Sequence, residues 1–255
     1  MDSISREIAF PDSRVVDEEN FELDDDSDAI QSELLVKQYE GTISDGYSKI
    51  FVFDSLMSKA LKKSFLRYKK VATFTCKPIK PKEYLENSDF KQKIFEPSEM
   101  YQIDASTCVL FTGEDLLEEA FYDFTNSVFN FASANPTFIT SAALPAATHQ
   151  CGVASEESVA PFVRSLNTSS YKKKVSLKPL EQPNILPGIT ASILSKCHCM
   201  KISALSLVLY IDTMSVDSIG WERLRHHVGN IPGGHVFYNV YVDRKLSCEG
   251  GQMFM

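Results

Sequence analysis

The run from Ile202 to Ile211 is almost entirely apolar, and no other feature constrains the fold of this chain as strongly. A strand that is apolar at successive positions has no face that it can leave in water, so both faces of its sheet must be covered. The small-residue stretch 188–199 before it follows a Pro-Gly helix entry, and the amphipathic stretch 216–228 follows it. We therefore expect helices on both sides of a sheet.

The rest of the chain repeats this alternation of strands and helices. We predict strands at 49–53, 71–76, 107–112 and 136–142, helices at 54–68 and 114–131, and loops at 78–97 and 143–157. Residues 159–166 fit either a short helix or an extended piece, and residues 235–242 alternate as an edge strand does. Alternating strands and helices predict an α/β fold, a three-layer α/β/α sandwich with a mostly parallel sheet.

Charge divides the chain into unequal parts. Residues 1–40 hold thirteen Asp and Glu against three Lys and Arg, a net charge of −10, whereas the whole chain has −8, so the remainder carries +2. An acidic segment with few apolar residues cannot bury enough surface to offset its ordering entropy. We predict a disordered acidic leader over residues 1–44, one α/β domain over 45–242, and a flexible tail over 243–255.

Several residue groups invite a chemical interpretation, and each has a simpler one. Cys197-His198-Cys199 are consecutive on a helix, where side chains point about 100° apart and cannot chelate one metal ion together. His149 and Cys151 lie in a loop without an orienting motif. We therefore predict no catalytic residues, no cofactor and no metal.

Partners other than protein also lack support in the sequence. Lysine clusters such as Lys172-Lys173-Lys174 stand without aromatic platforms in a domain of low net charge, so we expect no nucleic acid. The sequence contains no apolar run of the roughly 18 residues that a transmembrane helix needs. The acidic first residues do not resemble a signal peptide, and the six cysteines show no framework spacing, so we expect a cytoplasmic protein.

The last residues form a small anchor. Met253 is apolar, Phe254 is aromatic and Met255 is the final residue of the sequence. Such a tail can place its ring in an apolar pocket while its carboxylate meets a lysine or backbone donors. The internal run Val240-Tyr241-Val242 has the same side-chain pattern without a free carboxylate, and we prefer the terminus.

Residues in the second half of the chain carry a resemblance to a known family. They are Pro161-Phe162, Arg164, Leu166, Leu180-Glu181-Gln182-Pro183-Asn184-Ile185, Leu194-Ser195, Lys201-Ile202, Leu209-Tyr210, Asp212 and Asn230-Ile231-Pro232. Together they resemble the matching segments of the proteasome assembly chaperone 1 family. The similarity covers roughly residues 47–255 and is strongest over 161–217.

The resemblance implies a non-catalytic function. Members pair with proteasome assembly chaperone 2 as a heterodimer and sit on the α-subunit ring of the 20S core particle, where they promote ring formation and prevent off-pathway association. Family tails end in a hydrophobic residue, a tyrosine and any residue, which enter pockets between α subunits. Met253, Phe254 and Met255 match these positions, with phenylalanine in place of tyrosine. We expect the nucleus as a second location beside the cytoplasm.

Two other classes of function stay open at this stage. An α/β domain of this size could be an enzyme that binds a small molecule at the carboxyl ends of its strands, with Asp54 and Asp212 as candidates. Helix capping explains both aspartates as well. Alternatively, the chain is an adaptor of another complex whose tail has no function.

Overall fold

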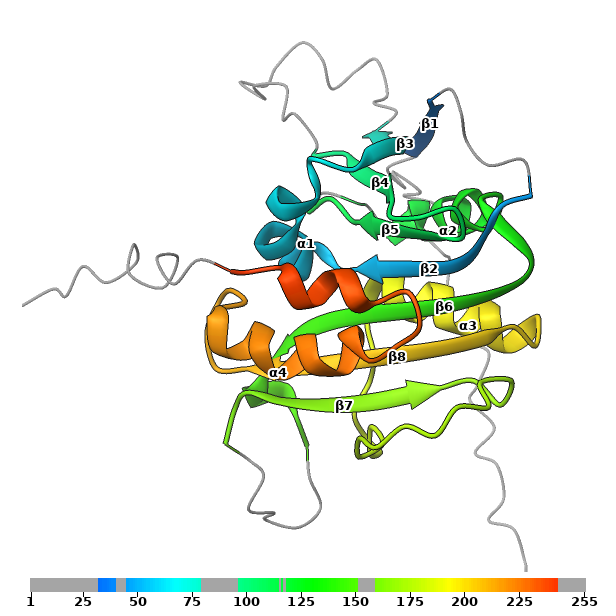
Figure 1. The fold of residues 1–255 in the computed structure, drawn as a ribbon. Coiled ribbons are helices and arrows are strands. Elements are labelled where there is room, and N and C mark those ends of the chain that lie inside the picture. Colours follow the sequence, from blue (N-terminus) through cyan, green and yellow to red (C-terminus); the bar gives the residue numbers. More distant parts are fainter. Residues whose placement is uncertain are drawn as a thin grey trace, which may run out of the picture. The chain divides into compact units, whose positions relative to one another are not determined.

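The computed structural model of the chain describes residues 32–39, 45–78, 96–114, 116, 118–150 and 159–242, and all that follows concerns these residues. They form one eight-stranded sheet in the order β1-β3-β4-β5-β2-β6-β8-β7 (Figure 1). The strands are β1 Ser32–Gln38, β2 Tyr47–Phe53, β3 Lys69–Pro78, β4 Ser98–Gln102, β5 Thr107–Phe111, β6 Ala132–Pro145, β7 Phe162–Asn167 and β8 Ser203–Ile211. The predicted α/β class is confirmed.

The prediction of a mostly parallel sheet is wrong. The centre of the sheet is parallel, since β2 pairs in parallel with β5 and β6, and β6 pairs in parallel with β8. The other four neighbour pairs, β1–β3, β3–β4, β4–β5 and β7–β8, are antiparallel. Only residues 103–106 join β4 to β5, and so short a connection must reverse the chain, because a parallel crossover needs a dozen residues or more.

Helices cover both faces of this sheet (Figure 1). The helices are α1 Ser55–Leu61, α2 Phe121–Phe129, α3 Gly188–Cys199 and α4 Ser218–Gly229, with short 3₁₀ turns at Lys62–Phe65, Glu118–Ala120, Ala146–Thr148 and His235–Asn239. Successive residues of β2 point to opposite faces. Phe51 and Phe53 join a buried cluster with α1 and α4, whereas Ile50 and Val52 join one with α2 and α3.

The segment predicted as an edge strand at 235–242 forms a 3₁₀ helix instead. The aromatic ring of Phe237 lies 5.0 Å from the ring of Phe51 and 5.3 Å from that of Phe53, measured between centroids. Gly234 permits this turn, because a Cβ there would lie 2.0 Å from the carbonyl oxygen of Val228. The alternation of apolar residues that suggested a strand comes from one turn of helix that buries Phe237 and a following residue, Val240.

One strand lies within the range that we predicted as the disordered leader. Strand β1 lies inside the range 1–44 that we assigned to the leader, and it pairs with β3 along seven residues. The remainder of that leader up to residue 31, residues 40–44 and the predicted tail 243–255 lie outside the described residues. Within the described ranges, no helix is long and apolar enough to cross a membrane.

Candidate functional site

Residues 238–242, which we call the base of the tail, are hydrogen-bonded to α4. Trp221 Nε1 donates a hydrogen bond of 2.8 Å to the carbonyl oxygen of Val240, and Arg225 Nη1 donates one of 3.0 Å to that of Tyr238. The side chain of Val242, the last described residue, is buried. The chain is therefore held by α4 and the core up to residue 242.

The predicted anchor residues Met253, Phe254 and Met255 lie outside the described residues, so their assignment stays a prediction. The internal run with the same pattern is described. There, Val240 and Val242 are buried, whereas Tyr241 is 77% exposed, with the Arg225 guanidinium 5.7 Å from its ring centroid. Two of its three side chains belong to the core, so this run cannot enter a partner's pocket as a unit.

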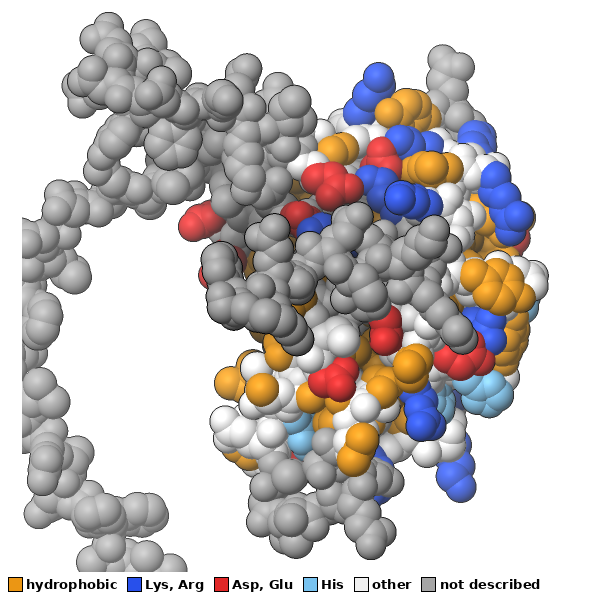
Figure 2. Space-filling view, turned by 90° about the vertical axis from the view of Figure 1, so that its left-hand side faces the viewer, with side chains coloured by type: hydrophobic (Ala, Val, Ile, Leu, Met, Phe, Trp, Pro, Cys, Tyr) orange, Lys and Arg blue, Asp and Glu red, His pale blue; other side chains and the backbone are white. Residues whose placement is uncertain are grey.

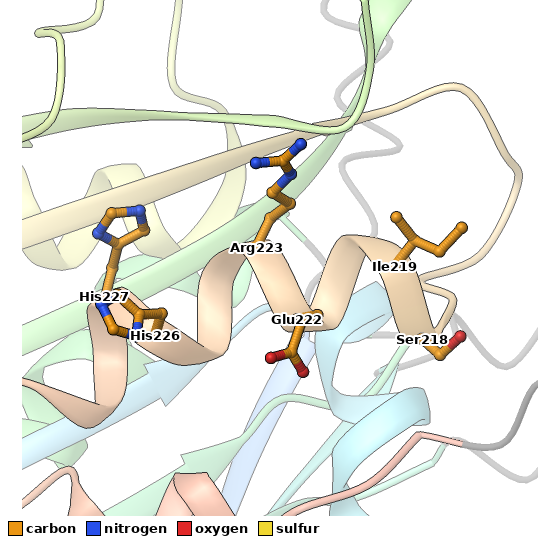
Figure 3. A pocket seen from close by; sticks show the side chains of 6 residues that line it. All are labelled: Ser218, Ile219, Glu222, Arg223, His226 and His227. Atoms are coloured by element: carbon orange, nitrogen blue, oxygen red, sulfur yellow. The ribbon is translucent and has the colours of Figure 1, made fainter.

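A shallow open groove of about 570 Å³ runs along the outer surface of α4. Its lining consists of Ser218, Ile219, Glu222, Arg223, His226 and His227. Figure 3 shows these side chains fanning out from the helix, with Arg223 and Glu222 on different sides, instead of converging on one point. An active site needs convergent polar groups, so this arrangement fits a protein-binding surface better than a catalytic one.

Burial and the neighbouring imidazole of His226 both lower the pKa of His227. A lowered pKa disfavours the charged imidazolium, so His227 is poorly suited to complement the negative end of the α4 dipole as a cation. Ile219 is 61% exposed on the same surface. The α4 groove thus combines one exposed apolar side chain, Ile219, with the charged side chains of Glu222 and Arg223.

Several of the residues that carry the family resemblance meet at the β7 edge of the sheet. Arg164 of β7 donates from Nε to Glu181 Oε2 at 3.1 Å, and its guanidinium lies 4.7 Å from the ring centroid of Phe162. Phe162 stacks on Tyr210 of β8 with centroids 5.0 Å apart. Burial on its own would raise the pKa of Glu181, but backbone and Arg164 hydrogen bonds outweigh it and lower that pKa.

The run Leu180–Ile185 braces this edge. The Leu180 N–H donates to the Ser165 carbonyl oxygen at 2.8 Å, and the Ser165 N–H donates to that of Lys178 at 3.0 Å. Asn184 exchanges two hydrogen bonds of 2.7 Å with the backbone of Gln150. The run Leu180–Ile185 therefore has a structural role: it covers part of an edge strand and joins two loops.

The aspartates of the enzyme hypothesis do not come together. Asp54 caps α1, accepting from the Met57 N–H at 2.8 Å, and also accepts from the Ala143 N–H of β6 at 2.7 Å. Burial raises the pKa of Asp54 to about 6, although these two hydrogen bonds oppose the rise. Asp212 is exposed and does not cap α4, whose N-cap is Asp217. Strand β6 separates β2 from β8, the strands that precede Asp54 and Asp212.

The residues considered for metal binding or for a catalytic thiol do not form such a site among the described residues. Cys197 is buried, while His198 and Cys199 are exposed. Among the residues that the structure describes, no group of three or more His, Cys, Asp or Glu side chains could hold a metal ion. The His149 ring packs edge-on against Tyr210 at 4.8 Å between centroids, and Cys151 lies outside the described residues.

Charged residues around α1 and the neighbouring strands pair with one another. Glu99 of β4 accepts from Lys70 at 2.5 Å and from Tyr101 at 2.7 Å, and Lys62 lies 3.1 Å from both Glu99 and Glu96. Burial alone would raise the pKa of Glu99, but the bonds from Lys70, Tyr101 and Lys62 outweigh it and lower that pKa. Figure 2 views the side of the molecule on which α1 lies and shows acidic and basic side chains interspersed there.

Sequence reasoning missed the contribution of Trp221 and Arg225 to the base of the tail. Trp221 is the sole tryptophan of the chain, and a buried indole N–H usually needs an acceptor. That requirement was a usable signal, but the acceptor, the carbonyl of Val240, is nineteen residues away. Its identity depends on the fold.

Comparison with known proteins gives three findings. A family model described as Proteasome assembly chaperone 4 matches residues 98–235, more than half of the chain. Proteasome assembly chaperone 1 of Danio rerio is 34% identical over 135 residues, 50% of this chain and 47% of the fish protein. The Homo sapiens protein of the same name is 38% identical over 65 residues, 26% of this chain and 23% of that protein. The matched segments thus span about half or less of these relatives' length.

Solved structures share the fold. Pyrococcus furiosus PbaA, an archaeal homolog of proteasome-assembly chaperone, aligns in its monoclinic form with a TM-score of 0.53 at 10% identity, over 78% of this chain and 82% of that one. Pyrococcus furiosus PbaB, an archaeal proteasome activator, aligns with a TM-score of 0.50 at 15% identity, over 81% and 93%. At these identities the likeness concerns the fold alone.

Proposed function

Because this chain belongs to the proteasome assembly chaperone family, we propose that it is a non-catalytic chaperone for assembly of the 20S proteasome. The observation that carries the proposal is the family match, which begins at β4 and ends at the 3₁₀ helix that leads into the base of the tail. The fanned-out side chains on α4 and the structural surroundings of Asp54 support binding over catalysis.

In finer detail, we propose that the chain pairs with proteasome assembly chaperone 2 and that the pair binds the α-subunit ring. There it promotes ring formation and prevents rings from associating off the pathway. The exposed Ile219 on α4 and Met214, 94% exposed in the loop before it, support binding of a protein partner, because exposed apolar side chains are favourable where a partner covers them. We propose the cytoplasm and the nucleus as the places of this activity.

We further propose that Met253, Phe254 and Met255 enter a pocket between α subunits. The structure supports a rigid origin for this tail, since Trp221 and Arg225 hold the backbone just before residue 243. The thirteen residues 243–255 can span up to about 45 Å. Once the domain has docked, tail binding becomes effectively intramolecular, so three weakly binding residues are sufficient.

The experiment that tests the proposal is reconstitution of α rings from 20S subunits with this chain and proteasome assembly chaperone 2. We expect the wild-type chain to co-purify with the ring and to raise its yield. Truncation before Met253 should weaken binding, and Phe254→Ala should weaken it by a comparable factor. Phe254→Tyr should retain or strengthen binding, because a phenolic hydroxyl can add a hydrogen bond of about 1 kcal/mol.

Tyr122→Ala is the matched control, since Tyr122 is 74% exposed on α2, and it should leave ring binding unchanged. If Tyr241→Ala abolishes binding while Phe254→Ala does not, the internal run is the anchor and the tail proposal is wrong. If the wild-type chain ignores α subunits with its partner supplied, the function itself is wrong.

A further inference from the structure

The two edge strands of the sheet differ in what lies beside them. At one end of the sheet, the segment 178–180 covers β7 through its hydrogen bonds with Ser165. At the other end, β1 pairs with β3 on one side and has no strand on its other side within the described ranges (Figure 1). An uncovered edge presents N–H and C=O groups that another strand can pair with.

The β1–β3 register decides which residues of β1 present those groups. The Tyr39 N–H donates to the Val71 carbonyl oxygen at 3.0 Å, directly after β1 ends. In an antiparallel ladder, alternate residues bond to the same neighbour, so odd-numbered residues of β1 direct their backbone groups to β3. The even-numbered residues direct theirs outward, and these are Ser32, Leu34, Val36 and Gln38.

This edge has a charged residue, Lys37, but neither of two other features that protect edge strands, a proline or a bulge. Its seven residues, SELLVKQ, contain no proline, and the register with β3 shows no bulge. Leu35 and Val36 are 38% and 39% exposed. β1 therefore presents outward backbone groups along its edge and partly exposed apolar side chains on the faces beside that edge.

The sequence of β1 is complementary to itself when it is reversed. We propose that the β1 edge pairs antiparallel with the β1 edge of a second copy of this chain, with the two-fold axis at Leu35. In that register, Leu34 stands opposite Val36 of the other copy, and Ser32 opposite Gln38. Glu33 of each copy stands opposite Lys37 of the other copy, so the contact contains two pairs of opposite charge.

The outward backbone groups and the charges select the same register. Leu34 and Val36 of the two copies form hydrogen-bonded pairs, as their outward N–H and C=O groups require. A shift by two residues keeps this hydrogen bonding but places Lys37 opposite Leu35, and a parallel arrangement loses the cross-strand pairing of Glu33 with Lys37. An isologous contact of this kind closes into a dimer and does not propagate.

The proposal goes beyond the proposed function and does not depend on it, because it concerns a second copy of the chain and no proteasome subunit. Its test is the sedimentation of the purified full chain over about two decades of concentration around the micromolar range. We expect a reversible monomer–dimer equilibrium for the wild-type chain. A chain that stays monomeric throughout this range overturns the proposal.

Charge reversal tests the register. Lys37→Glu and Glu33→Lys should each weaken dimerisation by about tenfold or more, because each places like charges opposite one another twice. An equimolar mixture of the two variants should dimerise again, since each then meets its opposite, and the double variant should also dimerise. Lys173→Glu, an equal charge change at an exposed loop residue, is the matched control and should have no effect.

Val36→Pro tests the backbone contact. It removes an outward N–H while the β1–β3 hydrogen bonds of odd-numbered residues stay available, so the variant should fold and remain monomeric. Hydrogen exchange of the β3 amides confirms that β1 is still paired.

Two outcomes would contradict the proposal directly. If a dimer persists unchanged in Val36→Pro and in both charge variants, the copies associate elsewhere. If the wild-type chain is monomeric while the Leu34 and Val36 amides resist exchange, another part of the same chain covers the edge.

Discussion

On the face covered by α1 and α4, Phe237, close to the last described residue, completes the core, whereas α2 and α3 cover the opposite face. Phe237 contacts the rings of Phe51, Phe53 and Phe65, all within 5.4 Å between centroids. On the other face, Phe124 of α2 packs on Phe74 at 5.0 Å. The base of the tail therefore depends on the packing of one face and not of the other.

The largest effect that we expect comes from removing Phe237. Phe237→Ala should lower the free energy of unfolding by about 3–5 kcal/mol, because a fully buried ring is lost and a cavity remains. Chemical denaturation measures this loss. The variant should also speed amide exchange at residues 238–242, since these residues follow the 3₁₀ turn that Phe237 fixes.

Phe124→Ala supplies the matched change on the other face. It should cost a similar free energy, because Phe124 is equally buried, but it should leave exchange at residues 238–242 close to the global unfolding limit of that variant. If amide exchange at residues 238–242 is equally fast in both variants, it depends only on global stability. The proposed difference between the two faces would then be wrong.

The next effect is a pH dependence at Asp54, on the same face as Phe237. Burial raises its folded pKa to about 6 from an ordinary 3.8, so folding favours the protonated form. Its contribution to stability is fully present below about pH 4 and is lost as the pH rises through 6. The size of the loss is about 2–3 kcal/mol.

The Asp54→Asn variant isolates this contribution. The difference in unfolding free energy between wild type and variant should fall by that amount between pH 4 and 6.5. Glu99 serves as an internal contrast: its pKa is lowered, so its contribution is lost as the pH falls instead of as it rises. A difference that stays flat across the range would show that Asp54 titrates normally.

A smaller effect follows from Trp221→Phe. This change keeps most of the buried ring and removes the donor to the Val240 carbonyl, which is left without that bond in a buried site. We expect a loss of about 1–2 kcal/mol. We also expect faster proteolytic cleavage near residues 240–242 than in wild type at matched global stability. Unchanged cleavage would show that Arg225 alone fixes the base.

Elements with a strong local pattern could be predicted from the sequence. β2, β8, α3 and α4 agree with the predicted segments to within a few residues, because a buried strand or a capped amphipathic helix imposes its period on consecutive residues. The helix predicted at 114–131 is shorter in the structure, where α2 begins at Phe121. Directly before α2, Glu118–Ala120 form a 3₁₀ turn, a difference that apolar spacing cannot reveal.

Elements that depend on distant partners could not be predicted. Strand β4 directly follows the lysine- and proline-rich stretch 78–97, and no element was predicted over its residues, whereas β1 lies in the acidic range that we assigned to the leader. Both are strands because β3 offers them backbone partners. For the site, the sequence indicated a binding tail, but the link between Trp221 and Val240 that supports it arises only in the folded chain.

The smallest effect tests the helical face. Thr125 of α2 and Ser192 of α3 share a hydrogen bond of 2.8 Å, and Thr125→Val removes it while nearly preserving the shape of the side chain. We expect a loss of about 1 kcal/mol, since the Ser192 hydroxyl can still find water at the half-buried end of the pair. Thermal and chemical denaturation should show this loss, with exchange at residues 238–242 following global stability as in Phe124→Ala. Because no residue of this pair contacts the face that holds the tail base, any selective loosening of residues 238–242 in Thr125→Val would mean that the sheet transmits strain between its faces, and that the two faces are not independent.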